Sequence, residues 1–502
     1  MLIDDTIRKL NVLIGEVADL RHTAALLEWD ERVNMPPGGA PAHGDMLAAV
    51  RRLEHEKFTS DEIGRLLQDA AANLDGLDPD SETVRTIGVT ARDYDKAVRV
   101  PADFVARQAR VESAAHHAWR EARANSDFSA FQPHLEKVID LKRQYITFFP
   151  PSDHPYDVLL DDCEPGIKTA DVKAMFSALR PRQVELVHAL QQRPQVEDGL
   201  LHHAYPEQSM WDFAVDVIST VGFDWTRGRQ DKSAHPFATA FTRDDVRITT
   251  RFEDHQPFGL LFGSLHETGH GLYEQGLDPK WNRTMLEGGA SLGVHESQSR
   301  LWENLVGRSL PFWEFFFPRL QRRFPSQLGA STVEQFYRAI NKVQPSLIRT
   351  EADEATYNLH VMLRVEMEMA MISDDVGVAD LPALWNSRMK EYLGLVPGNA
   401  ASGILQDIHW SICLFGYFAT YTIGNVISVQ LWEAFQSADP TRDDQIRRGD
   451  FAALRSWLQQ AIHQHGRRYE PQELVERVTG APIDPAPYLR YLETKYQHIY
   501  NL

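Results

Sequence analysis

Two histidines stand four residues apart in the run HETGH at 266–270, and they can act together only on a helix. Positions i and i+4 of an α-helix share one face, so His266 and His270 can reach the same metal ion. A second run, HESQSR, begins at residue 295 and supplies Glu296, 26 residues beyond His270. The chain must therefore fold so that two separate helices lie side by side.

Two imidazoles and one carboxylate leave the fourth position of a tetrahedral zinc ion free for water, as in catalytic sites. Glu267 adjoins His266 and cannot easily bind the same ion, so we expect it to act as general base and then protonate the leaving amine. His295 is an alternative third ligand, because imidazole is the commonest metal donor. We favour Glu296, because peptidases use two histidines and a glutamate. The pattern indicates a zinc hydrolase, in the first place a peptidase.

Local signals predict the helices that carry these residues. Pro257 suits the first turn of a helix and Gly276 its end, which predicts a helix over 257–275. A second helical pattern covers 285–306, after a turn that contains Asp278-Pro279. Helices joined in this way pack antiparallel, which would bring Glu296 toward the histidine pair.

Helical periodicity dominates the rest of the chain, including a long apolar stretch over 403–435, with one exception. Residues 246–252 alternate with period two, which predicts a half-exposed strand just before the metal helix, and 235–241 is its candidate hairpin partner. Such a strand can hold an extended substrate backbone. No linker is evident, so we expect one mostly helical domain over 1–502 with a small sheet beside the active site.

Composition excludes several functional classes. The net charge of −19 argues against nucleic acid or anionic membrane as partners. Residues 410–432 carry no formal charge, but interspersed polar side chains favour a helix buried in a large protein over a membrane span. Cys163 and Cys413 form no CxxC pair, which favours a reducing compartment, and the first residues contain no apolar signal core.

Several runs together give the chain a specific resemblance. It resembles the carboxypeptidase Taq family of zinc metallocarboxypeptidases, a branch of the zinc peptidases with a glutamate ligand. The runs that carry the resemblance are WDERVNMP at 29–36, YDVLLDDCEPG at 156–166, HPF at 235–237, DVRIT at 245–249, HETGHGLYEQG at 266–276, HESQSRLWEN at 295–304, IRTEADEATYNLH at 348–360, GILQDIHW at 403–410 and GYFATYTIGN at 416–425.

The resemblance implies a fold and an activity. Family members are mostly helical, two-lobed bodies around a deep groove, related in shape to neurolysin and angiotensin-converting enzyme. They remove single residues from peptides with a free C-terminus, with broad side-chain tolerance and poor release of proline. They use one zinc ion per subunit, which cobalt can often replace, and they are usually cytoplasmic homodimers.

The resemblance also implies roles for individual residues. His409 and Tyr417 are similar to the histidine and tyrosine that stabilise the oxyanion in related helical zinc peptidases, and Tyr421, one turn away, competes with Tyr417. From the residues alone, His409 could equally be a core residue of a long apolar helix. By position, the metal ligands and the catalytic base of the family match His266, His270, Glu296 and Glu267.

A carboxypeptidase must also bind a free α-carboxylate, and a guanidinium group matches it with two hydrogen bonds. Arg349 is the first candidate, although it could instead pair with Glu351, Asp353 or Glu354. Arg247, on the predicted strand, is the second candidate, and it could instead be a solvent-facing residue that limits edge pairing. Alternatives to a carboxypeptidase are a helical zinc endopeptidase or dipeptidase and, from a different class, a helical scaffold in which HETGH is incidental.

Overall fold

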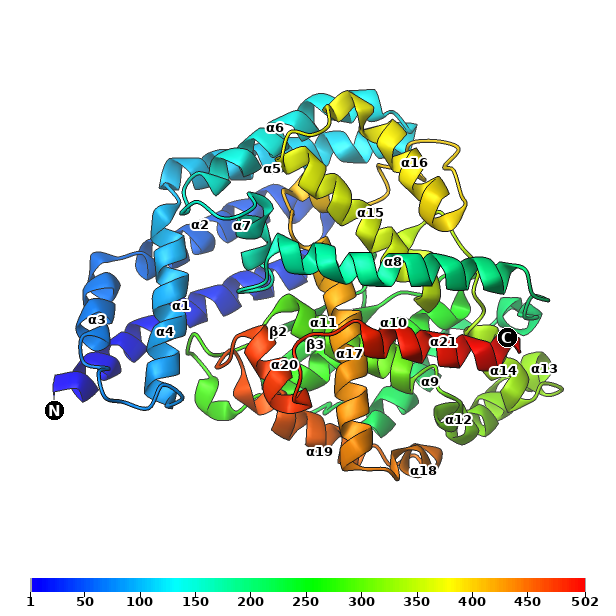
Figure 1. Cartoon of the computed structure of the whole chain (residues 1–502). Helices are drawn as coiled ribbons and strands as arrows, with labels where there is room; N and C mark the ends of the chain where they lie inside the picture. The colour runs from blue at the N-terminus through cyan, green and yellow to red at the C-terminus, as the bar shows by residue number, and fades with distance from the viewer. Residues whose placement is uncertain (1, 502) are drawn as a thin grey trace.

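The computed structural model describes residues 2–501, and within them the protein is mostly helical with one small sheet (Figure 1). This confirms the predicted fold class. The α-helices are α1 (Leu2–Val33), α2 (Ala40–Phe58), α3 (Asp61–Ala71), α4 (Glu82–Arg99), α5 (Ala102–Asn125), α6 (Phe128–Ile146), α7 (Tyr156–Asp161), α8 (Thr169–Gln191), α9 (Glu207–Val221), α10 (Pro257–Gly276), α11 (Leu292–Arg300), α12 (Leu310–Arg323), α13 (Pro325–Leu328), α14 (Val333–Ile340), α15 (Glu354–Ile372), α16 (Leu381–Leu393), α17 (Phe418–Ala438), α18 (Arg442–Arg447), α19 (Ala452–Ala461), α20 (Pro471–Thr479) and α21 (Ala486–Tyr500). The strands are β1 (Gly228–Lys232), β2 (Ala238–Thr242) and β3 (Asp245–Thr250).

Buried apolar side chains form two clusters. The larger one includes residues of α8, α10, α15, α17 and α21, and the smaller one joins α1, α3 and α4 to the segment 281–286. In Figure 1, α17 runs through the middle of the molecule, with α8 crossing it, while α1, α3 and α4 lie at the N-terminal end. The helices that carry the predicted site thus belong to the larger core.

The sheet has the strand order β1-β3-β2. β2 pairs antiparallel with β3, with Thr239 opposite Arg247, which confirms the predicted hairpin partner. β1 pairs parallel with β3 and was not predicted, because its sequence GRQDK has no apolar alternation. Val246 and Ile248 of β3 are fully buried, as the predicted alternation requires. The prediction was wrong at its far end: β3 ends at Thr250, and Thr249 is also fully buried, because Ser233 and Phe237 contact its hydroxyl.

Two predicted helices begin later than expected. The pattern over 285–306 was wrong in its first part: α11 begins at Leu292, after Gly288 adopts a positive φ of 99° and Ser291 caps the helix. The helix predicted over 403–435 was also wrong in its first part. Residues 409–412 form a short 3-10 turn, and α17 begins only at Phe418, because Cys413 and Gly416 adopt left-handed backbone conformations. His409 therefore lies on a turn and not in a long helix.

Two glycines let the metal-site helices approach closely. A Cβ on Gly269 of α10 would lie 2.5 Å from the Cα of Ser299 in α11. A Cβ on Gly424 of α17 would lie 2.7 Å from the Cβ of Glu296 in α11. Only glycine permits this backbone contact, so α11 sits between α10 and α17 with Glu296 held at a fixed depth.

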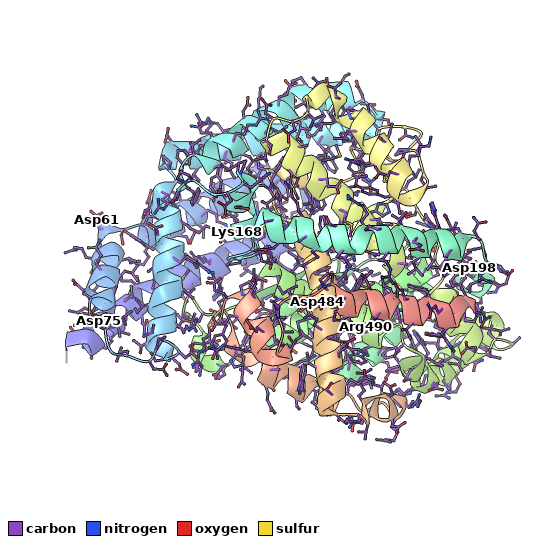
Figure 2. All side chains as sticks on the ribbon, in the orientation of Figure 1. Asp61, Asp75, Lys168, Asp198, Asp484 and Arg490 are labelled. Carbon is purple, nitrogen blue, oxygen red and sulfur yellow. The ribbon has the colours of Figure 1, made fainter. Side chains whose placement is uncertain are left out.

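The outer surface carries charges of both signs. Figure 2 labels exposed residues of both signs, among them Asp61 at the start of α3, Lys168 just before α8 and Arg490 on α21. Acidic side chains outnumber basic ones, 71 to 52, which accounts for the net charge of −19. Within residues 2–501, no helix combines the length and the apolar character that crossing a bilayer requires.

Candidate metal centre

The three predicted metal ligands converge. Oε2 of Glu296 lies 3.6 Å from Nε2 of His266 and 3.5 Å from Nε2 of His270. Ligand atoms bound to one tetrahedral zinc ion at about 2.0–2.1 Å stand roughly 3.4 Å apart, so these separations fit a shared ion. Among residues 2–501, these side chains are the one group of three or more His, Cys, Asp or Glu residues close enough to hold a metal.

Burial and charge favour the deprotonated, metal-binding forms of His270 and Glu296, but not that of His266. Burial lowers the pKa of His270 to about 3, which keeps its imidazole neutral. Burial alone would raise the pKa of Glu296, but Arg300 and His266 outweigh it and hold the pKa well below its ordinary value. Burial likewise lowers the pKa of His266, but Glu296, Glu303 and Glu267 together outweigh it and the net pKa is raised, so a cation would compete with this proton.

Each imidazole is oriented by its second ring nitrogen. Nδ1 of His266 lies 2.9 Å from Oε2 of Glu303, which also pairs with Arg300 at 3.3 Å. Glu303 lies in a π-helix, η4 (Leu301–Val306), which continues directly from α11. A carboxylate behind a ligating histidine fixes the ring and its tautomer. Glu303 was not predicted as a site residue, because no local sequence pattern signals a π-helix.

His295, the alternative ligand, lies behind His270. Its Nδ1 is 2.6 Å from Nδ1 of His270, and its Nε2 is 2.7 Å from Oε1 of Glu274. Both ring nitrogens of His295 are therefore engaged away from the ligand cluster. The chain Glu274–His295–His270 orients the second ligand as Glu303 orients the first.

Glu267 is buried beside this cluster. Burial raises the pKa of its carboxyl group to about 7, and the nearby imidazole of His266 lowers it only in part. The side chains of His266 and His270 keep 19% and 17% of their surface exposed, whereas that of Glu296 keeps 7%. Solvent can thus reach the imidazole side of the cluster.

Three other candidate residues, Tyr417, Tyr421 and Arg349, lie around His409. Its Nε2 lies 3.3 Å from the hydroxyl of Tyr421, and its ring centroid lies 5.6 Å from that of Tyr417. Burial, followed by the charge of Arg349, lowers the pKa of His409 to about 3, so its imidazole is neutral. Burial is the main cause that raises the pKa of both tyrosines; the charge of Glu296 adds to it at Tyr417, and the nearby Tyr417 adds to it at Tyr421.

Arg349 is buried and ion-paired, but not with the acids expected from the sequence. Its Nε and Nη2 donate to Oδ1 of Asp407 at 3.0 and 2.9 Å, and its Nη1 donates to the hydroxyl of Tyr357 at 3.0 Å. The guanidinium also lies 5.0 Å from the ring of Tyr421. Oδ2 of Asp407 accepts from Nε of Arg364 at 2.5 Å, so one carboxylate serves two buried arginines.

Arg247 belongs to a different cluster. Its guanidinium forms two hydrogen bonds of 2.9 Å with Asp245 and stacks on Trp29 and Phe241 at 4.3 and 4.7 Å. Its side chain is only 17% exposed. The solvent-facing alternative for this residue is therefore wrong, because α1, which carries Trp29, covers it.

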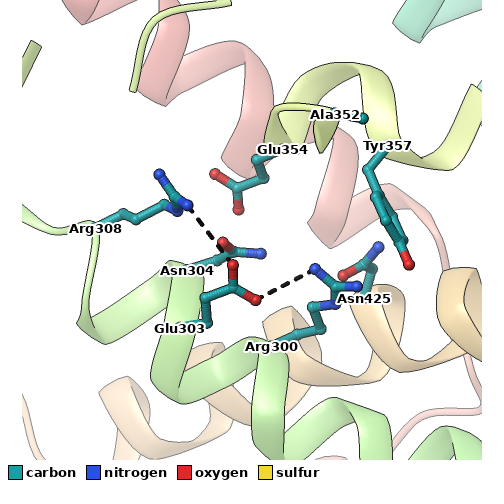
Figure 3. A pocket seen from close by; sticks show the side chains of 8 residues that line it. All are labelled: Arg300, Glu303, Asn304, Arg308, Ala352, Glu354, Tyr357 and Asn425. Atoms are coloured by element: carbon teal, nitrogen blue, oxygen red, sulfur yellow. Dashed lines mark hydrogen bonds and ion pairs between the residues drawn. The ribbon is translucent and has the colours of Figure 1, made fainter. Parts of the chain in front are cut away.

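A small polar cavity adjoins the metal cluster on the side of Glu303 (Figure 3). Arg300 and Arg308 approach Glu303 from opposite sides, and Glu354 lies above it. The cavity volume is about 20 Å³, which suits a single water molecule. The charges behind His266 are thus enclosed within the protein.

Comparisons with known proteins agree with this geometry. The sequence profile described as carboxypeptidase Taq (M32) metallopeptidase matches residues 9–496. Thermostable carboxypeptidase 1 of Thermus thermophilus is 40% identical over 498 residues, 97% of each chain, and carboxypeptidase 1 of Bacillus subtilis is 35% identical over 494 residues, 98% of each. The crystal structure of an M32 carboxypeptidase from Deinococcus radiodurans, 40% identical, covers 99% of this chain and is itself fully covered, with a TM-score of 0.96. The chain therefore belongs to the carboxypeptidase Taq family and is a metallocarboxypeptidase, a peptide hydrolase that uses a divalent metal ion.

Proposed function

We propose that this protein is a zinc-dependent carboxypeptidase that removes single residues from peptides with a free C-terminus. The proposal rests on the convergence of three side chains. Oε2 of Glu296 lies 3.6 Å from Nε2 of His266 and 3.5 Å from Nε2 of His270. The donor set of two imidazoles and one carboxylate suits zinc, and cobalt binds similar sites. The resemblance adds broad side-chain tolerance.

Zinc held by these three side chains would lower the pKa of a water molecule and polarise the scissile carbonyl. Glu267 takes the proton of the attacking water and delivers it to the departing amine. A pKa raised by burial to about 7 supports this role, because a base and acid used in turn works best near the ambient pH. Glu303 and His295 keep the two imidazoles oriented throughout.

His409 and Tyr417 donate hydrogen bonds to the oxyanion that develops on the former carbonyl oxygen. The neutral imidazole of His409 supports this role, since its Nδ1 is buried without a partner among the described residues. Tyr421 holds the other ring nitrogen and is the alternative oxyanion donor. One positioned donor in such a site contributes about 3–4 kcal/mol to transition-state stabilisation.

Arg349 binds the terminal carboxylate, with Arg247 as the alternative. Arg349 lies beside His409 and Tyr421, which supports its choice, and Asp407 orients its guanidinium. Both arginines are already paired with an aspartate, so the carboxylate must share a guanidinium that Asp407 or Asp245 also contacts. Arg349→Lys and Arg247→Lys discriminate the two, because the residue that captures the carboxylate should raise KM far more when its fork is lost.

Mass analysis of products from a mixed peptide set tests the proposal. We expect stepwise loss of single C-terminal residues, no cleavage of the same peptides after C-terminal amidation, and no cleavage after treatment with chelator until zinc is restored. Cleavage of amidated peptides would support the endopeptidase instead. Release of intact dipeptides would support the dipeptidase. A protein without stoichiometric metal and indifferent to chelator would be the scaffold.

We further propose a cytoplasmic homodimer, as the resemblance implies. The two cysteines are buried and unpaired, which supports a reducing compartment. Light scattering on the purified protein tests the dimer: a mass near 57.2 kDa would contradict it, and twice that mass would support it. Metal analysis of protein purified from its own cells tests the assignment of zinc.

A further inference from the structure

Glu368 of α15 is fully buried and accepts hydrogen bonds from three residues on two segments of the chain. The hydroxyl of Tyr156, on α7, donates to Oε2 at 2.6 Å. The backbone N–H of Gly416 donates to the same oxygen at 2.9 Å, and Nε1 of Trp410 donates to Oε1 at 2.9 Å. Both carboxylate oxygens are therefore satisfied, yet the proposed function gives this acid no part in the reaction.

Two of the three donors bracket the segment that carries the proposed oxyanion donors. Trp410 directly follows His409, and Gly416 directly precedes Tyr417. The side chain of Glu368 thus forms hydrogen bonds to both ends of the segment 409–417, which links a short 3-10 turn to α17. If Glu368 moved, Trp410 and Gly416 would lose their hydrogen bonds, and the adjacent residues His409 and Tyr417 would shift with them.

The segment between these two anchors is conformationally unfavourable. Cys413 adopts a φ of 57°, a left-handed conformation that an L-residue other than glycine rarely takes. Gly416 has a φ of 83°, and a Cβ there would lie 2.2 Å from the carbonyl oxygen of Leu159 in α7. Such conformations persist only where the surroundings hold them, and Glu368 with Tyr156 supplies that hold.

We propose that Glu368 is a positioning residue that fixes His409 and Tyr417 for catalysis. Glu368 acts through the hydrogen bonds that it accepts from Trp410 and Gly416, and not by contact with the candidate metal ligands. This inference rests on the proposed oxyanion role of His409 and Tyr417. Tyr156 is the support of Glu368 and not itself an anchor of the segment.

Variants can break these hydrogen bonds without removing volume. In Glu368→Gln one carboxylate oxygen is replaced by an NH2 group, which cannot accept a hydrogen bond. In either orientation of the amide, this group faces a donor, either Trp410 or the pair Tyr156 and Gly416. Tyr156→Phe removes only the hydrogen bond from α7. The same helix offers matched controls: Glu366 accepts from the hydroxyl of Tyr392 at 2.5 Å and pairs with Arg180, away from the segment 409–417.

The experiment measures kcat, KM, bound metal and thermal midpoint on a short N-acylated peptide with a free C-terminus. In Glu368→Gln, kcat should fall about 10- to 100-fold, because a shift of about 1 Å in a catalytic group has this effect. KM and metal content should stay within about threefold, since binding groups are untouched. Tyr156→Phe should lose kcat in the same direction but less, while Glu366→Gln and Tyr392→Phe should stay within about twofold.

A second measurement separates positioning from general destabilisation. In a background that carries both His409→Ala and Tyr417→Phe, Glu368→Gln should lower kcat further by less than about threefold, because both donors that Glu368 positions are already absent. Fully multiplicative losses, or equal losses in Glu366→Gln, would overturn the inference. If kcat is normal in Glu368→Gln but low in His409→Ala, the positioning role of Glu368 is overturned and the oxyanion role of His409 stands. If kcat is normal in both His409→Ala and Tyr417→Phe, the oxyanion role is overturned as well. If Glu368→Gln does not fold, a normal kcat in Tyr156→Phe overturns the inference.

Discussion

Nδ1 of His266 lies 2.9 Å from Oε2 of Glu303, although the two residues are on different helices and 37 positions apart. The carboxylate can make this contact because a π-helix carries it, and π turns shift the side chains that follow them. Arg300 and Arg308 hold the same carboxylate from the other side. The metal centre therefore depends on a residue outside both sequence motifs.

Replacing Glu303 by Gln should weaken metal binding. The amide retains the size of the carboxylate but not its charge, so it supports the imidazole of His266 less well. We expect affinity for zinc to fall about 10- to 100-fold, as for other carboxylates behind metal-bound histidines. Competition with a chelating dye measures the affinity directly. Unchanged affinity would show that Glu303 serves only to balance Arg300 and Arg308.

Glu267 and His270 should respond differently to removal. Glu267→Gln should keep the metal and lower kcat by about 10²- to 10⁴-fold, since it removes the general base alone. His270→Ala should lose both metal and turnover. Metal analysis, kinetics and circular dichroism on the same preparations separate these cases from misfolding. Near-normal turnover in Glu267→Gln would mean that another group is the base.

Gly269 should tolerate no side chain, because a Cβ there would lie 2.5 Å from Ser299 Cα and 2.6 Å from the carbonyl oxygen of Gln298. Gly269→Ala should lower the free energy of unfolding by about 1–3 kcal/mol or more through overpacking. Gly259→Ala, on the exposed side of the same helix, is the control, because its Cβ would approach nothing closer than 3.9 Å. This substitution should stabilise the helix by up to about 1 kcal/mol. Urea unfolding of both variants checks the opposite signs.

Glu164 should make stability depend on pH. It accepts a hydrogen bond from the backbone N–H of Gly293 in α11, but burial raises its pKa from 4.5 to about 8. The folded protein then keeps a proton that the unfolded chain releases. The contribution of Glu164 to the free energy of unfolding is full below pH 4.5. It is lost as the pH rises toward 8, by up to about 1.4 kcal/mol per pH unit.

Glu164→Gln should flatten this part of the profile, because glutamine resembles the protonated acid and cannot ionise. Unfolding by urea at intervals between pH 5 and pH 8 compares the two proteins. An identical slope in both would assign the pH dependence to other groups.

The sequence by itself determined many of the local elements and the candidate ligand set. The spacing of His266 and His270 required a helix, and period-two alternation located β3. The resemblance of several runs also gave the family and its mostly helical fold. These features could be read because helical and strand periodicity, glycine and proline positions and short motifs are properties of neighbouring residues.

Only the tertiary structure decided which side chains meet. Glu303 stands behind His266, Asp407 lies 58 residues from Arg349 and takes the place of the nearby acids, and Glu368 joins α7, α15 and the segment 409–417. The late start of α11 and α17 also followed from left-handed residues and close helix packing, which outweigh apolar periodicity. Partners of buried charges are chosen by the packing of whole helices, and no local pattern of residues contains that information.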